Sequence, residues 1–291
     1  MDTNVIVVGT DGSGPSTAAV RWAAREAQRR GADLRVVLAH HWIWPGARFD
    51  VESGWRQLAD QQAETTLATA VDQAREVAPD VIVRHDIVPA EAAPALLDAG
   101  TKASMLVVGN RGWGGFGSLM LGSVGQLVAT QAPCPVVVVR GRRDIADGPV
   151  VVGVDGSSSS LDALRMAYEL AVERQAPLVA VRAYQPPPPR WAVDVEPLGY
   201  NAKQRDAAEH EALAESLAPW RDKYPDVAVE ALVAKGGAAR VLVGVSHTAQ
   251  LVVVGSRGYG AITGTVVGSV GLQLLHHADC PVLIAHLPTD A

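Results

Sequence analysis

The chain consists of two copies of one sequence unit, and this repeat constrains its fold more than any other feature. The segment VVGNRGWGGFGSLMLGSVG at residues 107–125 has a counterpart, VVVGSRGYGAITGTVVGSVG, at residues 252–271. Gly109, Gly112 and Gly122 match Gly255, Gly258 and Gly268 at a separation of 146 residues, and the segments VVGTDGS and VVGVDGS, which open the two copies, lie 144 residues apart. A repeat of this length is an ordinary domain and is far too long for a solenoid. We therefore expect two domains, at residues 1–140 and 149–291, joined by a linker at 141–148.

Composition limits the class of protein. A hydrophobic content of 48% indicates ordered globular domains, and a net charge of −6 argues against nucleic acid as a general partner, since phosphates are bound by basic faces. No apolar run is long enough to span a bilayer, and the acidic start MDTNVIVVGTDGS is unlike a signal peptide. We expect a cytoplasmic protein that does not enter membranes. Cys134 and Cys280 each precede proline at the start of an apolar strand, a position typical of a small buried hydrophobe.

Strands and helices alternate in each copy. In the first copy, apolar runs predict strands at 4–10, 34–40, 81–88, 104–109 and 135–140, and helical periodicity predicts helices near 16–30, 56–77, 91–103 and 123–131. Gly31 is the expected end of the first helix. This alternation predicts a doubly wound α/β fold, with a parallel sheet that binds ligands at the carboxyl ends of its strands. The segments GTDGS and GNRGWGG follow two such ends and should meet across one crevice.

The glycine segments have the properties of a phosphate-binding loop. Gly109 and Gly112 allow the backbone to approach a ligand closely and to adopt positive φ. Gly122 and Ser123 lead into a helix whose first amides lack partners and carry the positive end of the helix dipole. Ser123 either caps this helix or donates its hydroxyl to a phosphate. No lysine lies in either segment, so this is not the Gly-Lys-Ser/Thr loop of nucleotide hydrolases. The same glycines would also permit a tight strand-to-helix loop that binds nothing.

Three segments of the first copy resemble the universal stress protein family. They are VVGTDGS, the GNRG that is followed after nine residues by GSVG, and the closing CPVVVV. Both copies match over nearly their whole length, so the chain resembles a tandem, two-domain member. The resemblance implies an adenine nucleotide alpha hydrolase-like fold, with five-stranded sheets ordered 3-2-1-4-5. The G-2x-G-9x-G(S/T) spacing is the family's ATP-binding signature, which implies ATP, with Mg²⁺, in each half. The family also pairs its closing strands, which implies an intramolecular pseudo-dimer and leaves a homodimer open.

The resemblance assigns roles by position. Asp11 and Asp155 would line the adenosine end after the first strand of each copy, and His41 and Ala183 would contact adenine through their backbones. His41 departs from the usual small aliphatic residue, and its bulk would narrow the first adenine pocket. Arg111 and Arg257 lie inside the loops, where they either screen the triphosphate or stay solvated. The ribose and phosphates would be held by Gly109, Gly112, Gly122, Ser123 and Val124 in the first copy, and by Gly255, Gly258, Gly268, Ser269 and Val270 in the second.

Other chemistries have weaker support in the sequence. Neighbours on a strand, such as His40 and His41, point to opposite faces, and His276 and His277 lie near a helix end that favours a cation anyway, so we expect no metal site. Without a loop lysine or a water-positioning residue, we expect at most weak catalysis. The sequence therefore favours a nucleotide-dependent regulatory protein of the stress response. A slow ATPase or nucleotidyl-transfer enzyme, and an interaction scaffold with relict loops, are the alternatives.

Overall fold

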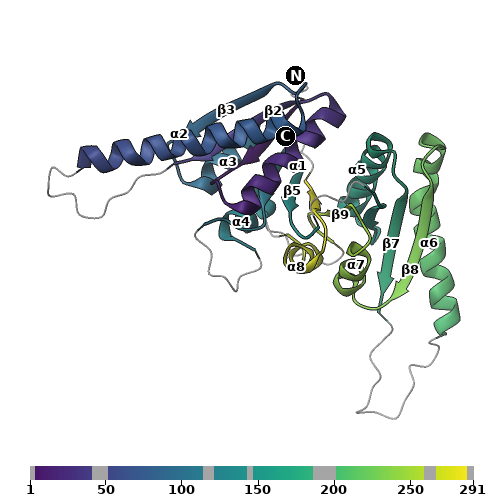
Figure 1. The fold of residues 1–291 in the computed structure, drawn as a ribbon. Coiled ribbons are helices and arrows are strands. Elements are labelled where there is room, and N and C mark those ends of the chain that lie inside the picture. The colour runs from purple at the N-terminus through teal and green to yellow at the C-terminus, as the bar shows by residue number, and fades with distance from the viewer. Residues whose placement is uncertain are drawn as a thin grey trace, which may run out of the picture. The chain divides into compact units, whose positions relative to one another are not determined.

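The fold is that of a computed structural model, which describes residues 4–40, 52–113, 121–142, 147–185, 201–258 and 267–286, with the side chains of the second range described from residue 57 onward. The chain divides into two compact units, Met1–Asp144 with His286–Ala291, and Ile145–Ala285. Four residues of the expected linker, 143–146, lie outside the described part of the chain. Strands and helices alternate in both units, as the sequence predicts (Figure 1).

The first unit contains a parallel sheet with helices on both faces. Its strand order is β3-β2-β1-β4-β5, and each of the described pairs is parallel. Helices α1 and α2 pack together on one face, and α3 and α4 on the other. The elements are β1 (Val5–Gly9), α1 (Gly14–Arg30), β2 (Asp33–Ala39), α2 (Glu52–Val77), β3 (Val83–Val88), α3 (Ala92–Gly100), β4 (Met105–Gly109), α4 (Ser123–Gln131) and β5 (Val136–Val139).

The second unit repeats this arrangement. Its strand order is β8-β7-β6-β9-β10, again with parallel pairs, so both units have the order 3-2-1-4-5 that the resemblance implies. Helix α5 packs with α6, and α7 packs with α8. The elements are β6 (Val150–Gly153), α5 (Ser158–Arg174), β7 (Leu178–Tyr184), α6 (Ala202–Lys223), β8 (Val229–Lys235), α7 (Ala238–Ser246), β9 (Leu251–Gly255), α8 (Ser269–His277) and β10 (Val282–Ala285).

Helix packing on both faces explains the unbroken apolar strands. Ile6, Val7 and Val8 of β1 are all buried, as is every residue of β5, since a strand covered on both sides has no polar face. Cys134 and Cys280 are buried and unbridged, which confirms that they are core residues. Burial raises the pKa of the Cys134 thiol to about 12, because the apolar surroundings disfavour the thiolate. Across the described ranges, every helix is too short or too polar to span a bilayer.

Two registers relate the units residue by residue. Gly9 pairs with Val37 across β1 and β2, and Gly153 pairs with Val181 across β6 and β7, so these strands correspond at a separation of 144 residues. Helix α1 ends at Gly31 with φ 58°, as predicted, while Gln175 takes the same left-handed position after α5 with φ 51°. These correspondences allow the two candidate sites to be compared position by position.

Helices α2 and α6 correspond at a separation of 146 residues. The buried Leu67 and Val71 of α2 match the buried Leu213 and Leu217 of α6. In each helix the two residues lie four positions apart, which places them on one face. The two helices therefore present equivalent faces to equivalent strands.

Candidate functional site

A cavity opens at the carboxyl ends of β1, β2 and β4 in the first unit, and a matching cavity opens at the ends of β6, β7 and β9 in the second. Their volumes are about 340 Å³ and about 470 Å³. In both, the turn after the first strand meets the start of the glycine segment and the first turn of the helix that follows it. This is the location at which open parallel sheets bind ligands.

The structure brings the predicted residues together at these cavities, with one exception. His41 lies outside the described residues, and its role stays a prediction. The predicted residues that line the first cavity are Asp11, Gly109, Arg111, Gly112, Gly122, Ser123 and Val124. Those that line the second are Asp155, Ala183, Gly255, Arg257, Gly258, Gly268, Ser269 and Val270.

The equivalence of His41 with Ala183 is wrong. The strand registers place Ala39, not His41, at the position of Ala183. Ala39 and Val37 line the first cavity as Ala183 and Val181 line the second. The first cavity therefore has the same small residue at this point as the second, and the expected narrowing has no basis at that position. The 144-residue spacing of the opening segments was the signal that would have identified Ala39.

Helices α4 and α8 begin at the cavities without a side-chain cap. Gly122 is the N-cap of α4, with φ −79° and ψ 156°, and Gly268 is the N-cap of α8. By contrast, the Ser13 hydroxyl accepts a hydrogen bond from the Ser16 amide at the start of α1. Ser123 is the first helical residue, so the alternative in which it caps the helix is wrong. The first-turn amides of α4 and α8 face the cavities with no capping side chain, which is the arrangement that binds anions.

The ends of each glycine segment are tied by main-chain hydrogen bonds. The Gly122 amide donates to the Asn110 carbonyl at 2.8 Å, and the Gly268 amide donates to the Ser256 carbonyl at 3.0 Å. An added Cβ at Gly122 would lie 3.6 Å from Arg111 Cα and 3.7 Å from the Asn110 carbonyl oxygen, which are ordinary van der Waals contacts, so a methyl group fits here without a collision. Gly122 also lines the cavity, so a larger side chain at this position would reach into it.

The prediction of positive φ at Gly109 and Gly112 is wrong. Among the described residues, glycines with positive φ include Gly12 and Gly156 but neither of these two. Close contacts explain them instead. An added Cβ at Gly109 would lie 2.7 Å from both the carbonyl carbon and the oxygen of Pro15, at the start of α1. At Gly112 it would collide with the Asp11 carboxylate. These glycines let the walls of the cavity approach one another.

Asp11 links the turn after β1 to the glycine segment. Its Oδ1 accepts a hydrogen bond from the Ser13 amide at 3.0 Å, and its Oδ2 accepts one from the Trp113 amide at 3.0 Å. Partial burial would by itself raise the pKa of Asp11, but hydrogen bonds from Ser13, Ser16 and Trp113 together outweigh it and hold the pKa below its usual value. The carboxylate is therefore ionised and already engaged at neutral pH.

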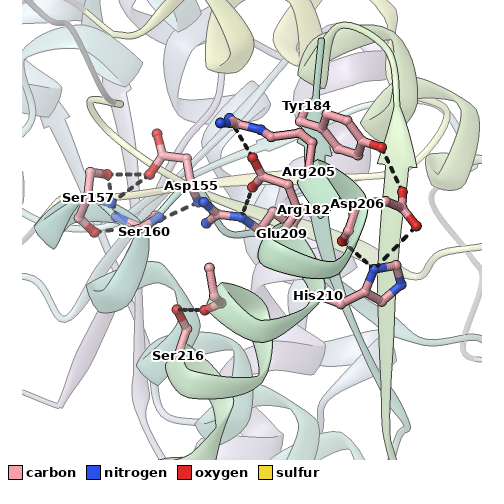
Figure 2. Close-up of polar contacts among 12 residues, drawn as sticks. Asp155, Ser157, Ser160, Arg182, Tyr184, Arg205, Asp206, Glu209, His210 and Ser216 are labelled. Carbon is pink, nitrogen blue, oxygen red and sulfur yellow. Dashed lines mark hydrogen bonds and ion pairs between the residues drawn. The ribbon is translucent and has the colours of Figure 1, made fainter. Parts of the chain in front are cut away.

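Asp155 occupies the corresponding place in the second unit (Figure 2). Its Oδ1 accepts hydrogen bonds from the Ser157 amide at 2.9 Å and from the Ser157 hydroxyl at 2.6 Å. An added Cβ at Gly258 would lie 2.8 Å from Asp155 Oδ2, so the turn and the glycine segment also approach closely here.

The opposite end of each cavity is apolar. In the first unit Leu96 of α3 joins Val37 and Ala39, and in the second unit Leu242 of α7 joins Val181 and Ala183. Sequence reasoning missed the two leucines, although they lie 146 residues apart like the glycine positions. Arg111 and Arg257 are exposed residues of the cavity linings, which agrees with either role considered for them. Each cavity thus combines an apolar slot, a carboxylate and an uncapped helix start.

The sequence profile of the Universal stress protein family matches residues 3–140 and 148–286. The chain belongs to the universal stress protein family. A universal stress protein of Mycobacterium tuberculosis is 37% identical over 292 residues, which cover 96% of this chain and 95% of that relative. Two tandem universal stress units therefore make up this chain.

A solved structure of similar length has the same fold. A universal stress protein from Archaeoglobus fulgidus covers 98% of this chain and 99% of its own, at a TM-score of 0.72 and 16% identity. A shorter universal stress protein from the same organism, solved in complex with dAMP, covers 48% of this chain and 100% of its own, at 25% identity and a TM-score of 0.36.

Proposed function

We propose that this protein is an ATP-binding regulatory protein of the stress response, with one nucleotide site in each unit. One observation carries the proposal: in both cavities the uncapped start of a helix faces an apolar slot. The amides of Ser123 and Val124, or of Ser269 and Val270, would bind phosphate oxygens, because they have no capping side chain and lie at the positive end of the helix dipole.

The apolar slot suits a nucleobase. Val37, Ala39 and Leu96 would enclose adenine in the first unit, and Asp11 would accept a hydrogen bond at the ribose end. The cavity volumes of about 340 Å³ and about 470 Å³ are those of ordinary small-molecule sites. Mg²⁺ would arrive with the triphosphate and be held chiefly by phosphate oxygens and water, as this ion usually is.

Binding without fast turnover is the favoured activity. Asp11 and Asp155 are the acidic residues among those that line the cavities, and Arg111 and Arg257 are the basic ones. The Asp11 carboxylate has a lowered pKa and accepts hydrogen bonds from two amides, which makes it a weak general base. If the protein is instead a slow ATPase or a nucleotidyl-transfer enzyme, phosphate release over hours will fall in an Asp11→Asn, Asp155→Asn variant.

Three further features of the proposal come from the family resemblance. The two units form an intramolecular pseudo-dimer through their closing strands, a homodimer is a further possible assembly, and the protein is cytoplasmic. Light scattering of the purified chain distinguishes a monomer from a homodimer, and cell fractionation measures the location.

The proposal is tested by the nucleotide content and stability of the purified protein. Mass spectrometry of released small molecules should find ATP, and Mg-ATP at 100-fold excess over the Kd should stabilise nucleotide-free protein by about 2.7 kcal/mol per occupied site. Calorimetry should give two sites per chain, and Gly122→Val should reduce this to one by filling the first cavity. Gly268→Val is the matched control, which should leave only the first site. No melting shift at millimolar ATP would support the scaffold alternative and refute the proposal.

A further inference from the structure

An ion-pair network joins β7 and α6 of the second unit (Figure 2). Arg182 of β7 donates from Nε to Oε2 of Glu209 at 2.6 Å, and Nη2 of Arg205 lies 2.6 Å from the other carboxylate oxygen. The side chains of Arg182 and Glu209 are only 18% and 7% exposed. Ion pairs this far from solvent are weakly screened, so the network ties β7 firmly to α6.

Arg182 lies close to two parts of the cavity lining, the strand β7 and the turn after β6. Its chain neighbours Val181 and Ala183 line the cavity from the other face of β7, since side chains alternate along a strand. Its guanidinium also lies beside the turn after β6, because a Cβ added at Gly156 would be 3.6 Å from Nη1. That turn carries Asp155, so one side chain connects the apolar slot to the carboxylate.

The first unit has no such pair. At the position of Arg182 it has Leu38, and at the position of Glu209 it has Ala63, and both of these residues are buried. Two complementary charges in one unit thus replace two apolar residues in the other. Such an exchange gives little net stability, because desolvation offsets most of the attraction between buried charges.

The turn beside the carboxylate is supported differently in the two units. In the first unit, an added Cβ at Gly12 would lie 2.7 Å from Cγ2 of Thr66 on α2, so a side chain of the helix covers the turn. The matching residue of α6 is Ala212, which is smaller. The guanidinium of Arg182 is the group found against Gly156 instead.

The Arg182–Glu209 pair is not the only polar contact between these elements. In both units a residue at or just after the end of the second strand contacts an aspartate of the following helix. His40 Nε2 lies 3.4 Å from Asp60 Oδ1, and the Tyr184 hydroxyl donates to Asp206 Oδ1 at 2.6 Å. The pair is an addition to the second unit, on the side of β7 that backs its cavity.

We propose that Arg182 is a positioning residue of the second site. Through Glu209 and Gly156 it fixes the placement of β7 relative to the turn that carries Asp155. Nucleotide affinity at the second site therefore depends on a charged pair that the first site lacks. This inference rests on the proposed nucleotide binding.

Calorimetric titration of the full chain with ATP tests it, with the first site blocked by Gly122→Val. Two changes are compared in that background, Arg182→Leu alone and Arg182→Leu combined with Glu209→Ala, which installs the residues of the first unit. The single change leaves Glu209 with one partner and should lower the melting temperature, while the double change should restore much of it. Both should weaken ATP binding by about 10-fold, because β7 and the turn that carries Asp155 lose their shared support.

The double variant separates positioning from stability. If it recovers the melting temperature but still binds weakly, Arg182 acts on the site; if its affinity returns to that of the parent, the pair is only structural and the inference is overturned. In a Gly268→Val background, which leaves only the first site, the same changes should have no effect, and a loss there would also overturn it. Absence of ATP binding by the unsubstituted chain would instead refute the proposed function itself, and the inference with it.

Discussion

Replacing Gly109 with alanine should destabilise the protein, although its backbone conformation accepts any residue. The added methyl group would lie 2.7 Å from the carbonyl carbon and oxygen of Pro15 and 3.0 Å from the Ser16 nitrogen. These are main-chain atoms of the first turn of α1, so no side-chain rotation relieves the collision, and α1 must move away from β4. Overpacking of this kind costs about 1–3 kcal/mol, and we expect the upper part of that range because the obstacle is backbone.

Gly122→Ala is the matched control. Its added methyl group has no protein atom within 3.6 Å, and the φ of −79° suits alanine. Alanine is a poorer N-cap than glycine, but it also restricts the unfolded chain, and these effects roughly cancel. Its stability should therefore stay within about 0.5 kcal/mol of the wild type. ATP binding should still weaken, because the methyl group enters the cavity.

Thermal unfolding followed by circular dichroism, on nucleotide-free protein, measures both variants. Since 1 kcal/mol shifts the midpoint of a chain of this size class by roughly 2–4 °C, Gly109→Ala should melt about 4–12 °C below the wild type. Gly122→Ala should melt near the wild type but gain less from ATP. Equal midpoints for Gly109→Ala and the wild type would refute the reasoning, since they would show that the close approach of α1 to β4 does not require glycine.

Three further predictions concern single residues. Asp11→Asn should lower the free energy of unfolding at pH 7 by about 0.5 kcal/mol. The difference from the wild type should shrink in urea titrations at pH 3, because a lowered pKa stabilises the fold only while the carboxylate is ionised. A difference that is equally large at both pH values would contradict this. The Cys134 pKa of about 12 implies that stability falls as the pH rises above the ordinary thiol value. Relative to Cys134→Ala, the wild type should therefore lose about 2 kcal/mol between pH 7 and pH 10, and a constant difference would argue against a buried neutral thiol. Gln175→Gly should raise the unfolding free energy by about 1 kcal/mol, because Gln175 has the left-handed conformation that Gly31 has in the first unit. Unfolding by denaturant measures this change, and a loss of stability would contradict the prediction.

Local sequence signals predicted most of the fold. Alternating apolar runs and helical periodicity placed every strand and helix of the first unit, and α4 has the predicted bounds, 123–131. Gly31 ends α1 as expected, because a left-handed C-cap favours glycine. The repeat carried these predictions to the second unit, since equal spacings of glycine and proline imply equal turns.

The parts that the sequence did not predict depend on contacts between distant residues. Gly109 looked like a residue chosen for its own φ, but the reason for it lies 94 positions earlier, at Pro15. Arg182 was not singled out in the sequence, because its partner Glu209 lies 27 positions later, on α6. A pattern within one segment reports the preferences of that segment, whereas these residues are determined by what packs against them.

The contact of α1 with β4 has a consequence for how this protein can change over generations. Where the two elements meet at Gly109, the opposing surface is peptide backbone, which every amino acid shares. Mutation of Pro15 or Ser16 can alter what projects from α1 but leaves those main-chain atoms in place. The close approach of α1 to β4 beside the first cavity therefore depends on Gly109 having no side chain, whatever side chains Pro15 and Ser16 are replaced by.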